Sequence, residues 1–261
     1  MKNDTNFDPL HCRFERNIYN SAKGKIRLAV IERDIQEQLT KEIAFPSSRV
    51  LDAGCGPGHV ALSLARKGAC LCLCDISTEM LAASQKRFST AKIPANQYAL
   101  VNCALQDIGR FQAGPYDLIL CHAVAEWLAR PEDVFDALLP LLKQDGWLSL
   151  VFYNFYGLEF KNLLRTNFKH FHPQDFQSHR GSLTPTRPLK PEEVMAWAAH
   201  HHLDLQVKSG IRVFHDYIFN KQDREREPEV LLQKELEYSR LDPYWKLGRY
   251  IHFLYKKTGH F

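Results

Sequence analysis

The sequence contains no long apolar run. None of its segments approaches the ~18 consecutive apolar residues that a membrane-spanning helix requires. Residues 1–9 are polar and acidic and hold no apolar signal core. Internal repeats and low-complexity stretches are also lacking, and 45% of the residues are apolar, which excludes a fibrous or disordered chain. We therefore expect a cytoplasmic protein without a membrane partner.

The cysteines lack the spacing of a metal site. A zinc site requires CxxC-type pairs or added histidines at ligand spacing, and none is found among the seven cysteines. Cys70, Cys72 and Cys74 alternate along one expected strand, so they share a face and read as small buried hydrophobic residues. A zinc site is the alternative, and we predict no metal. Free thiols in this number indicate a reducing compartment.

The chain carries little net charge. Its 34 Lys and Arg residues exceed its 30 Asp and Glu residues by four, which excludes a histone-like polycation but leaves room for a local patch. Such a patch lies between residues 159 and 190. Its basic residues are Lys161, Arg165, Lys169, Arg180, Arg187 and Lys190, against Glu159 and Asp175 only. We interpret residues 155–190 as a basic insertion that tracks phosphates, with a solvated loop as the alternative.

Strand patterns alternate with helix patterns along the chain. Residues 24–43 have helical apolar spacing, and we expect five strands to follow, at 49–53, 69–75, 98–103, 116–121 and 147–154. Helices are expected at 60–66, after Ser77, and at 132–143, and then at 155–168, 191–201 and 227–240. Two further strands are expected at 203–208 and 249–257. This order predicts an α/β Rossmann-like fold with a seven-stranded, mostly parallel sheet, helices on both faces and an antiparallel closing strand.

The 261 residues fit one domain with a sizeable buried core. Within it we distinguish an N-terminal helical segment, 1–46, and the basic insertion, 155–190.

Polar residues and glycines cluster where the expected strands end. Asp52 ends the first strand, and Gly54, Gly56 and Gly58 follow it in a GxGxG pattern, which allows close approach of a ligand to the backbone. The pattern is not the GxGxxG of dinucleotide sites, and no Lys-Ser/Thr follows as in a phosphate-binding P-loop. Asp75 ends the second strand, where a carboxylate suits ribose hydroxyls. Helix capping is the alternative for both aspartates.

Together with Gln106 and Asp107 after the third strand, these residues resemble the class I S-adenosylmethionine-dependent methyltransferases. The resemblance implies S-adenosylmethionine as cofactor. It implies that Asp52, Gly54, Cys55 and Gly56 lie under the methionine portion. It further implies that Asp75 binds ribose and that Leu105 and Gln106 flank the adenine. A redox nucleotide site is the alternative for the glycine loop taken alone.

A more specific resemblance extends over nearly the whole chain. The segments that carry it are 16–19, 23–27, 121–127, 148–154, 210–217 and 247–252. This combination is similar to the tRNA 5-carboxymethoxyuridine methyltransferase family. The family esterifies the carboxylate of 5-carboxymethoxyuridine at the tRNA wobble position to 5-methoxycarbonylmethoxyuridine, which implies the tRNA anticodon loop as partner. The chain departs from the family pattern at Cys55 and Pro57, and neither change removes a glycine.

The resemblance assigns two further cofactor contacts. Arg27 pairs with the cofactor carboxylate, for which a guanidinium is suited; a surface arginine is the alternative. His122 contacts the cofactor near the reacting methyl group, and a hydrogen-bonded core histidine is the alternative.

On the substrate side, we hypothesise that Arg212 pairs with the substrate carboxylate and that Tyr153 or an aromatic neighbour stacks on the base. An ion pair of Arg212 with Asp216 or Glu225 is the alternative. Strand alternation would place Arg212 and Phe214 on opposite faces. No general base is assigned, because a carboxylate with a pKa of about 4 is already ionised at neutral pH.

Two other functions compete with this one. The first is a methyltransferase for a small carboxylic acid or another metabolite, and the basic insertion argues against it. The second is a module without catalysis, and the intact glycine pattern with Asp75 argues against that.

Overall fold

The computed structural model describes residues 21–112, 114–168, 185 and 187–258. Five neighbouring parallel strands and two further strands form one seven-stranded sheet. The strand order is β3-β2-β1-β4-β5-β7-β6, and β7 runs antiparallel to both of its neighbours. The strands are β1 (Arg49–Ala53), β2 (Cys70–Asp75), β3 (Tyr98–Asn102), β4 (Tyr116–His122), β5 (Leu142–Tyr153), β6 (Leu203–Ile211) and β7 (Tyr250–Lys257). The predicted fold class, including the antiparallel closing strand, is confirmed.

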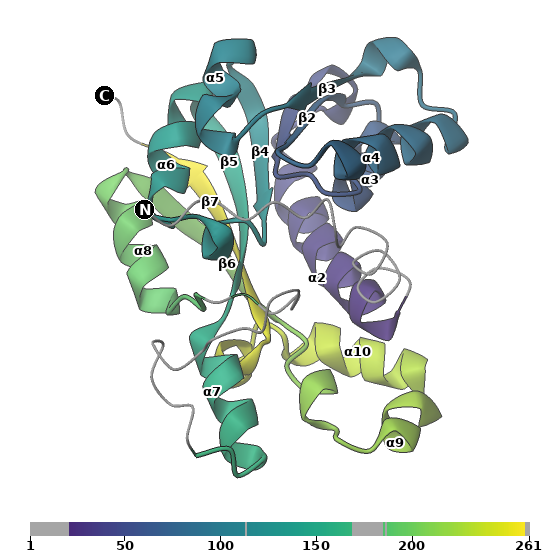
Figure 1. Ribbon diagram of the computed structural model, residues 1–261, viewed down its shortest axis with the longest axis vertical. Coiled ribbons are helices and arrows are strands. Elements are labelled where there is room, and N and C mark those ends of the chain that lie inside the picture. Colours follow the sequence, from purple (N-terminus) through teal and green to yellow (C-terminus); the bar gives the residue numbers. More distant parts are fainter. Residues whose placement is uncertain (1–20, 113, 169–184, 186, 259–261) are drawn as a thin grey trace.

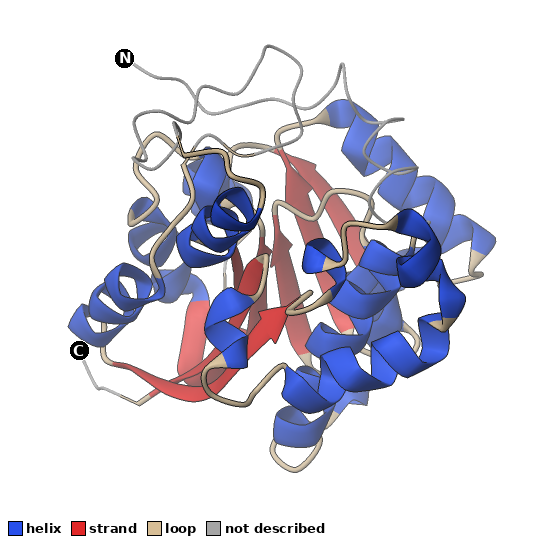
Figure 2. Cartoon of the chain, turned by 90° about the horizontal axis from the view of Figure 1, so that it is seen from below, coloured by secondary structure: helices blue, strands red, loops and turns tan. Residues whose placement is uncertain are grey.

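Helices cover both faces of this sheet (Figures 1 and 2). They are α2 (Ala22–Leu39), α3 (His59–Ala65), α4 (Thr78–Thr90), α5 (Ile108–Phe111), α6 (Asp133–Leu138), α7 (Phe155–Leu164), α8 (Pro191–His200), α9 (Lys221–Arg226) and α10 (Pro228–Tyr238). Helices α7, α9 and α10 lie together at one end of the molecule, at the bottom of Figure 1.

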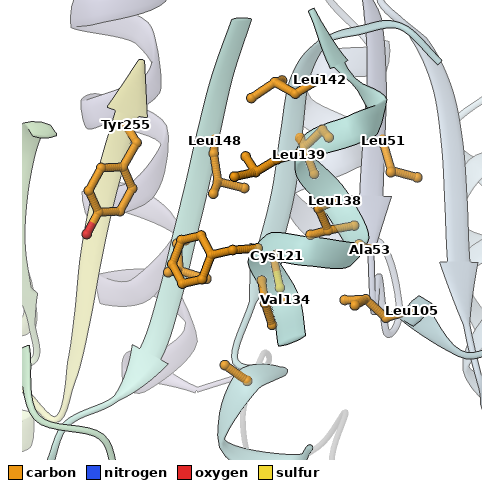
Figure 3. Close-up of a cluster of buried hydrophobic side chains, with 14 of the residues drawn as sticks. Leu51, Ala53, Leu105, Cys121, Val134, Leu138, Leu139, Leu142, Leu148 and Tyr255 are labelled. Carbon is orange, nitrogen blue, oxygen red and sulfur yellow. The ribbon is translucent and has the colours of Figure 1, made fainter. Parts of the chain in front are cut away.

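The sheet separates two apolar cores. Successive strand residues point to opposite faces, so Leu51 packs in one core while its neighbour Val50 packs in the other. Figure 3 shows Leu51 and Leu148 of the strands beside Leu138 and Leu139. The opposite core contains the apolar stripe of α2, with Val30 and Ile31 fully buried. This packing fixes α2, and with it Arg27, against the sheet.

Several predicted boundaries were wrong. The helix expected over 155–168 ends at Leu164, and the strand expected from residue 147 begins at Leu142. The helix expected over 132–143 ends at Leu138, because Pro140 lacks an amide hydrogen and its ring obstructs a continuing helix. A short 3-10 turn (Leu139–Leu141) leads directly into β5. The strand expected over 203–208 continues to Ile211 and ends there, because Arg212 adopts a left-handed conformation with φ of 62°. The expectation that strand alternation places Arg212 and Phe214 on opposite faces therefore does not apply.

The alternating cysteines are only partly buried. Cys72 and Cys74 lie in the core, as predicted, whereas Cys70 is exposed at the first position of β2. Residues 1–9 and 16–19, on which two sequence interpretations rest, lie outside the described residues. The described part of the N-terminal segment consists of α2 and the 3-10 turn Phe45–Ser47. Nearly half of the basic insertion, residues 169–184 and 186, also lies outside.

Candidate active site

The predicted cofactor residues meet at one edge of the sheet. Four predicted site residues lie at or next to the carboxyl ends of parallel strands. They are Asp52 on β1, Asp75 on β2, His122 on β4 and Tyr153 on β5. The crevice at this edge is where open α/β sheets bind their ligands. The structure thus brings together side chains that are up to about a hundred residues apart in the sequence.

The glycine loop is anchored to the neighbouring strand by its backbone. The amides of Gly54 and Cys55 both donate to the carbonyl oxygen of Cys74, at 2.8 and 2.9 Å. Gly54 has φ of +72°, and a Cβ built there would stand 2.4 Å from Val124 Cγ2. Only glycine therefore fits this position. At Gly56, by contrast, a Cβ would meet nothing within 4 Å, so open space adjoins that part of the loop.

Asp75 ties the loop to the end of β2. Its Oδ2 accepts the amide of Gly56 at 2.8 Å, and its Oδ1 accepts the amide of Ser77 at 2.9 Å. A carboxylate has about four lone-pair positions, so both oxygens can accept further hydrogen bonds. The N-cap of α4 is Ser77, whose hydroxyl accepts from the amide of Met80, and the N-cap of α3 is Gly58. Neither aspartate caps these two helices, so the capping alternative does not hold there.

Two carboxyl groups are buried at this edge. Burial raises the pKa of Asp52 to about 7, with a contribution from Asp75, and burial likewise raises the pKa of Glu126 to about 7. The positive charge of Arg27 opposes both shifts. The sequence interpretation did not include Glu126, although it lies in the segment that follows the fourth strand. The edge therefore holds acids that an additional positive charge would ionise.

These two acids predict an unusual pH dependence of stability. Because their pKa values are higher in the folded than in the unfolded chain, they lower the free energy of unfolding as the pH rises from about 4 through about 7. The pKa values of Asp34 and Asp216 are instead lowered in the folded chain. These two groups therefore raise the free energy of unfolding as the pH rises, and they do so only in more acidic solution, below about pH 4. Asp52→Asn is thus expected to stabilise the protein at pH ~8 by on the order of a few kcal/mol, and by clearly less at pH ~5. Denaturant unfolding measures this. The exposed Asp204→Asn is the control, and an equal effect at both pH values would contradict the prediction.

Arg27 lies within this cluster of acids and aromatic rings. The residue is 6% exposed, and its guanidinium carbon stands 5.1 Å from the centre of the Tyr250 ring. Within the described part of the chain, no carboxylate forms an ion pair with it. The alternative of a surface arginine is therefore wrong. Arg27 is a buried cation that could bind an anionic ligand.

The remaining predicted cofactor contacts lie nearby. Leu105 is buried and Gln106 is exposed in a 3-10 turn (Leu105–Asp107) after β3. His122 is half-buried, and its Nε2 lies 2.8 Å from the hydroxyl of Ser149. Burial lowers the pKa of His122 well below its ordinary value, aided by His252 and Arg27, so the ring is neutral.

A second cluster, which we call the cationic cluster, surrounds Asp216. It consists of Arg212, Arg249 and Lys161, whose nitrogens lie 3.7, 3.8 and 3.7 Å from the Asp216 carboxylate. Burial alone would raise the pKa of Asp216, but its neighbours, Arg212 foremost, lower it below its ordinary range. The ion pair of Arg212 with Asp216 that we considered thus exists, yet three cations face one carboxylate.

The cationic cluster has hydrogen-bond donors to spare. Arg212 Nε and Arg249 Nη1 are buried without a hydrogen-bond partner, since 3.7 Å exceeds hydrogen-bonding distance. Burial also lowers the pKa of Lys161 to about 8 and lowers that of Lys23. Orphaned buried donors are costly, and an anionic ligand would satisfy them. From the sequence we assigned Lys161 only to the basic patch and gave Arg249 no role in the site.

Aromatic rings connect the cationic cluster with Arg27. Arg249 lies 4.7 Å from the Tyr153 ring, Tyr153 contacts Tyr250 at 5.3 Å, and Arg212 lies 5.5 Å from the Tyr250 ring. Tyr250 also contacts Arg27, so the Tyr250 ring connects Arg27 with Arg212 of the cationic cluster. Tyr153 is only 1% exposed, so its ring offers no free face to a base.

Neither a metal nor a membrane is suggested by the part of the chain that the structure describes. Among these residues, no three His, Cys, Asp or Glu side chains gather closely enough to hold a metal ion. No described helix is both long and apolar enough to span a bilayer.

Comparisons with solved structures agree with the fold. The chain resembles magnesium protoporphyrin IX methyltransferase from Synechocystis with bound SAH, with a TM-score of 0.61 at 16% identity, covering 97% of this chain and 96% of the other. It also resembles the plantazolicin methyltransferase BpumL in complex with SAH, with a TM-score of 0.57 at 18% identity, covering 97% and 91%. At such identities these similarities establish the fold alone.

Comparisons of sequence go further. Residues 51–150 match the family described as "Methyltransferase domain". The chain is 29% identical to a ubiquinone biosynthesis O-methyltransferase of Chromobacterium violaceum, covering 80% of this chain and 79% of the relative. It is 38% identical, over 97% of both chains, to the tRNA 5-carboxymethoxyuridine methyltransferase of Escherichia coli. The match extends beyond the methyltransferase domain to nearly the whole length of both chains. The chain therefore belongs to the tRNA 5-carboxymethoxyuridine methyltransferase family.

Proposed function

We propose that this protein transfers a methyl group from S-adenosylmethionine to the carboxylate of 5-carboxymethoxyuridine at the wobble position of tRNA, forming the methyl ester. The observation that carries the proposal is the surplus of partly buried positive charge in the cationic cluster, which the Tyr250 ring connects with Arg27. It supplies an anion-binding site beside a cofactor site, as esterification of a carboxylate requires.

The residues at the sheet edge fit the cofactor. Arg27, a buried cation without a carboxylate partner among the described residues, would hold the cofactor carboxylate. The open space at Gly56 would admit the methionine portion, and Asp75 would accept the ribose hydroxyls. Asp52 would bear a negative charge near the cationic groups. When bound, S-adenosylmethionine supplies a methyl group activated by its positively charged sulfur.

The residues of the cationic cluster would position the acceptor. Arg212 and Arg249 each have a buried N–H group that a carboxylate oxygen can take. Their positive charge keeps the pKa of an entering carboxyl group low, so the acceptor stays ionised despite leaving water. The carboxylate is then a competent nucleophile, and the protein needs to align it and exclude water rather than remove a proton. This is why we assign no general base.

An exposed apolar surface on α7 and the loop before α9 suits unpaired bases. We call it the α7 tip, and it consists of Leu163, Leu164, Phe168 and Phe219, which are 41–61% exposed. The guanidinium of Arg165 lies 5.1 Å from the centre of the Phe219 ring, so a cation and an aromatic face are offered together. Single-stranded RNA is bound by this combination. We infer that the anticodon loop contacts this tip.

The α7 tip predicts two separable effects on tRNA binding. Arg165→Ala is expected to reduce the slope of log affinity against log salt by about 0.7–0.9, the value for one lost phosphate contact. Phe219→Ala is expected to lower the affinity by roughly 1–3 kcal/mol at every salt concentration, because it removes stacking but no charge. Fluorescence anisotropy with labelled tRNA measures both. Arg66→Ala, exposed at the end of α3, is the control, and an unchanged slope in Arg165→Ala would contradict the assignment.

A small carboxylic acid is the alternative acceptor, because the cationic cluster by itself does not require a nucleic acid. The exposed α7 tip favours tRNA. As for location, the free thiols of the described cysteines and the tRNA substrate are the grounds on which we propose the cytoplasm.

Mass spectrometry of tRNA nucleosides from cells that lack this protein tests the function. We expect the methyl ester to disappear and free 5-carboxymethoxyuridine to accumulate. Complementation with the wild-type gene should restore the ester. An unchanged nucleoside profile would refute the tRNA proposal and leave the small-acid alternative.

A further inference from the structure

A buried carboxylate holds the turn that follows β6. Glu235 belongs to α10, and among the residues of that helix, all of which the structure describes, it alone is fully buried. Its Oε2 accepts the amide of Val213 at 2.7 Å, and its Oε1 accepts the amides of Phe214 and His215 at 3.0 and 2.7 Å. Three successive amides thus point at one carboxyl group, which is the geometry of an anion-binding nest. The function proposed above makes no use of Glu235.

The nest depends on this side chain. Val213 and His215 are buried, and buried amides that lose their only acceptor are costly. Burial raises the pKa of Glu235, and the three amide hydrogen bonds oppose that shift because they favour the ionised form. Replacing the carboxyl group therefore leaves amides of the turn unpaired, and the turn is expected to rearrange.

The turn connects two charged residues of the acceptor site. Arg212, directly before the nest, has φ of 62°, a strained conformation for a residue with a side chain. Asp216, directly after the nest, is the carboxylate that the cationic cluster surrounds, and its Oδ1 lies 3.7 Å from Arg212 Nε. At the far end of the turn, the hydroxyl of Tyr217 donates to the carbonyl oxygens of Gly157 and Leu247. Release of the nest would thus free the end that carries the strained Arg212.

We propose that Glu235 is a positioning residue for the methyl acceptor, and that its carboxylate holds the turn in which Arg212 and Asp216 keep the arrangement that binds the carboxylate of the substrate base. The inference rests on the proposed function in that it takes the cationic cluster as the acceptor site. Glu235 acts through Arg212 and does not itself touch the substrate. Its replacement should therefore weaken recognition of the carboxylate and leave the binding of the cofactor and of the rest of the tRNA unchanged.

Glu235→Gln tests this role, because it retains the size of the side chain but offers a single acceptor oxygen. If that oxygen takes the place of Oε1, the NH₂ group faces the amide of Val213, directly after Arg212, and repels it. We expect the affinity for tRNA that carries 5-carboxymethoxyuridine to fall roughly tenfold, as for the loss of one hydrogen bond to a charged group. The affinity for tRNA with an unmodified wobble uridine should not change. Fluorescence anisotropy measures both, and Glu237→Gln, the same change at an exposed position of α10, is the control.

A merely structural role of Glu235 predicts a different result. It would lower the fraction of folded protein, and with it the binding of both tRNAs and of S-adenosylmethionine, but the ratio of the two tRNA affinities would stay that of the wild type. Calorimetric titration with S-adenosylmethionine shows whether the cofactor site is intact. An unchanged ratio in folded Glu235→Gln would overturn the proposal.

Glu235→Asp takes the place of Glu235→Gln if the latter does not fold. It retains the carboxylate on a side chain that is one carbon shorter, so the hydrogen bonds of the nest are lengthened rather than lost. The ratio of the two tRNA affinities is then expected to fall roughly threefold. An unchanged ratio in Glu235→Asp would overturn the proposal in the same way.

A double-mutant cycle identifies the residue through which Glu235 acts. Arg212→Ala should itself lower the ratio, and adding Glu235→Gln should lower it by less than about twofold more, because the guanidinium to be positioned is gone. A further loss of roughly tenfold would contradict action through Arg212. The wild-type ratio separates the two proposals. A wild-type protein that does not prefer the carboxylate-bearing tRNA would refute the proposed function, whereas a preference that Arg212→Ala lowers and Glu235→Gln does not would refute this inference alone.

Discussion

Arg249→Ala is expected to reduce kcat/KM for tRNA that carries 5-carboxymethoxyuridine by roughly 100-fold, because a buried charge-assisted pair is worth a few kcal/mol. Arg249 stacks on Tyr153, faces Asp216 and has a buried N–H group without a partner. Arg249→Lys retains the charge but not the planar fork, so an intermediate loss is expected. Single-turnover methylation with varied tRNA concentration measures the effect.

The substrate charge distinguishes this role from phosphate binding. Binding of tRNA with an unmodified wobble uridine should be nearly insensitive to Arg249→Ala, because that base has no carboxylate. Arg66→Ala should leave both tRNAs unaffected. An equal loss of affinity for the two tRNAs would show that Arg249 contacts the RNA backbone and would contradict the assignment of the cationic cluster to the carboxylate.

Arg27→Met is expected to weaken S-adenosylmethionine binding by about 10- to 100-fold, the cost of losing a charge-assisted interaction with the cofactor carboxylate. Methionine retains an apolar stem against Tyr250, so the packing of α2 should persist. Isothermal titration calorimetry measures the affinity.

A ligand without a carboxylate provides the control for Arg27. Binding of 5′-methylthioadenosine, which lacks the amino-acid portion, should be almost the same in the wild-type protein and in Arg27→Met. A similar loss for both ligands would mean that the substitution disturbs the site as a whole, and it would contradict a specific role in holding the carboxylate.

The fold was predictable because its signals are local. Alternation of strand and helix patterns gave the sheet, and the glycines after Asp52 gave the loop, whose conformation Gly54 requires. The errors occurred where backbone geometry overrode the apolar pattern. Pro140 ended a helix early, and the left-handed Arg212 ended a strand.

The site was predictable only in part, because some of its properties depend on tertiary contacts. Asp52 and Asp75 follow from their positions at strand ends. Glu126 has a pKa of about 7 only because packing excludes water from it. The cationic cluster joins Lys161, Arg212 and Arg249 from three distant segments. Tyr153, which we hypothesised to stack on the base, is only 1% exposed because its neighbours pack around it.

Methylation by the purified protein tests the central claim most directly. The protein is incubated with S-adenosylmethionine and tRNA that carries 5-carboxymethoxyuridine, and the digested nucleosides are analysed by mass spectrometry, with free carboxylic acids as competing acceptors. We predict conversion of 5-carboxymethoxyuridine to its methyl ester in tRNA and no esterification of the free acids. The account would be contradicted if the free acids were esterified while the 5-carboxymethoxyuridine in the tRNA remained unconverted.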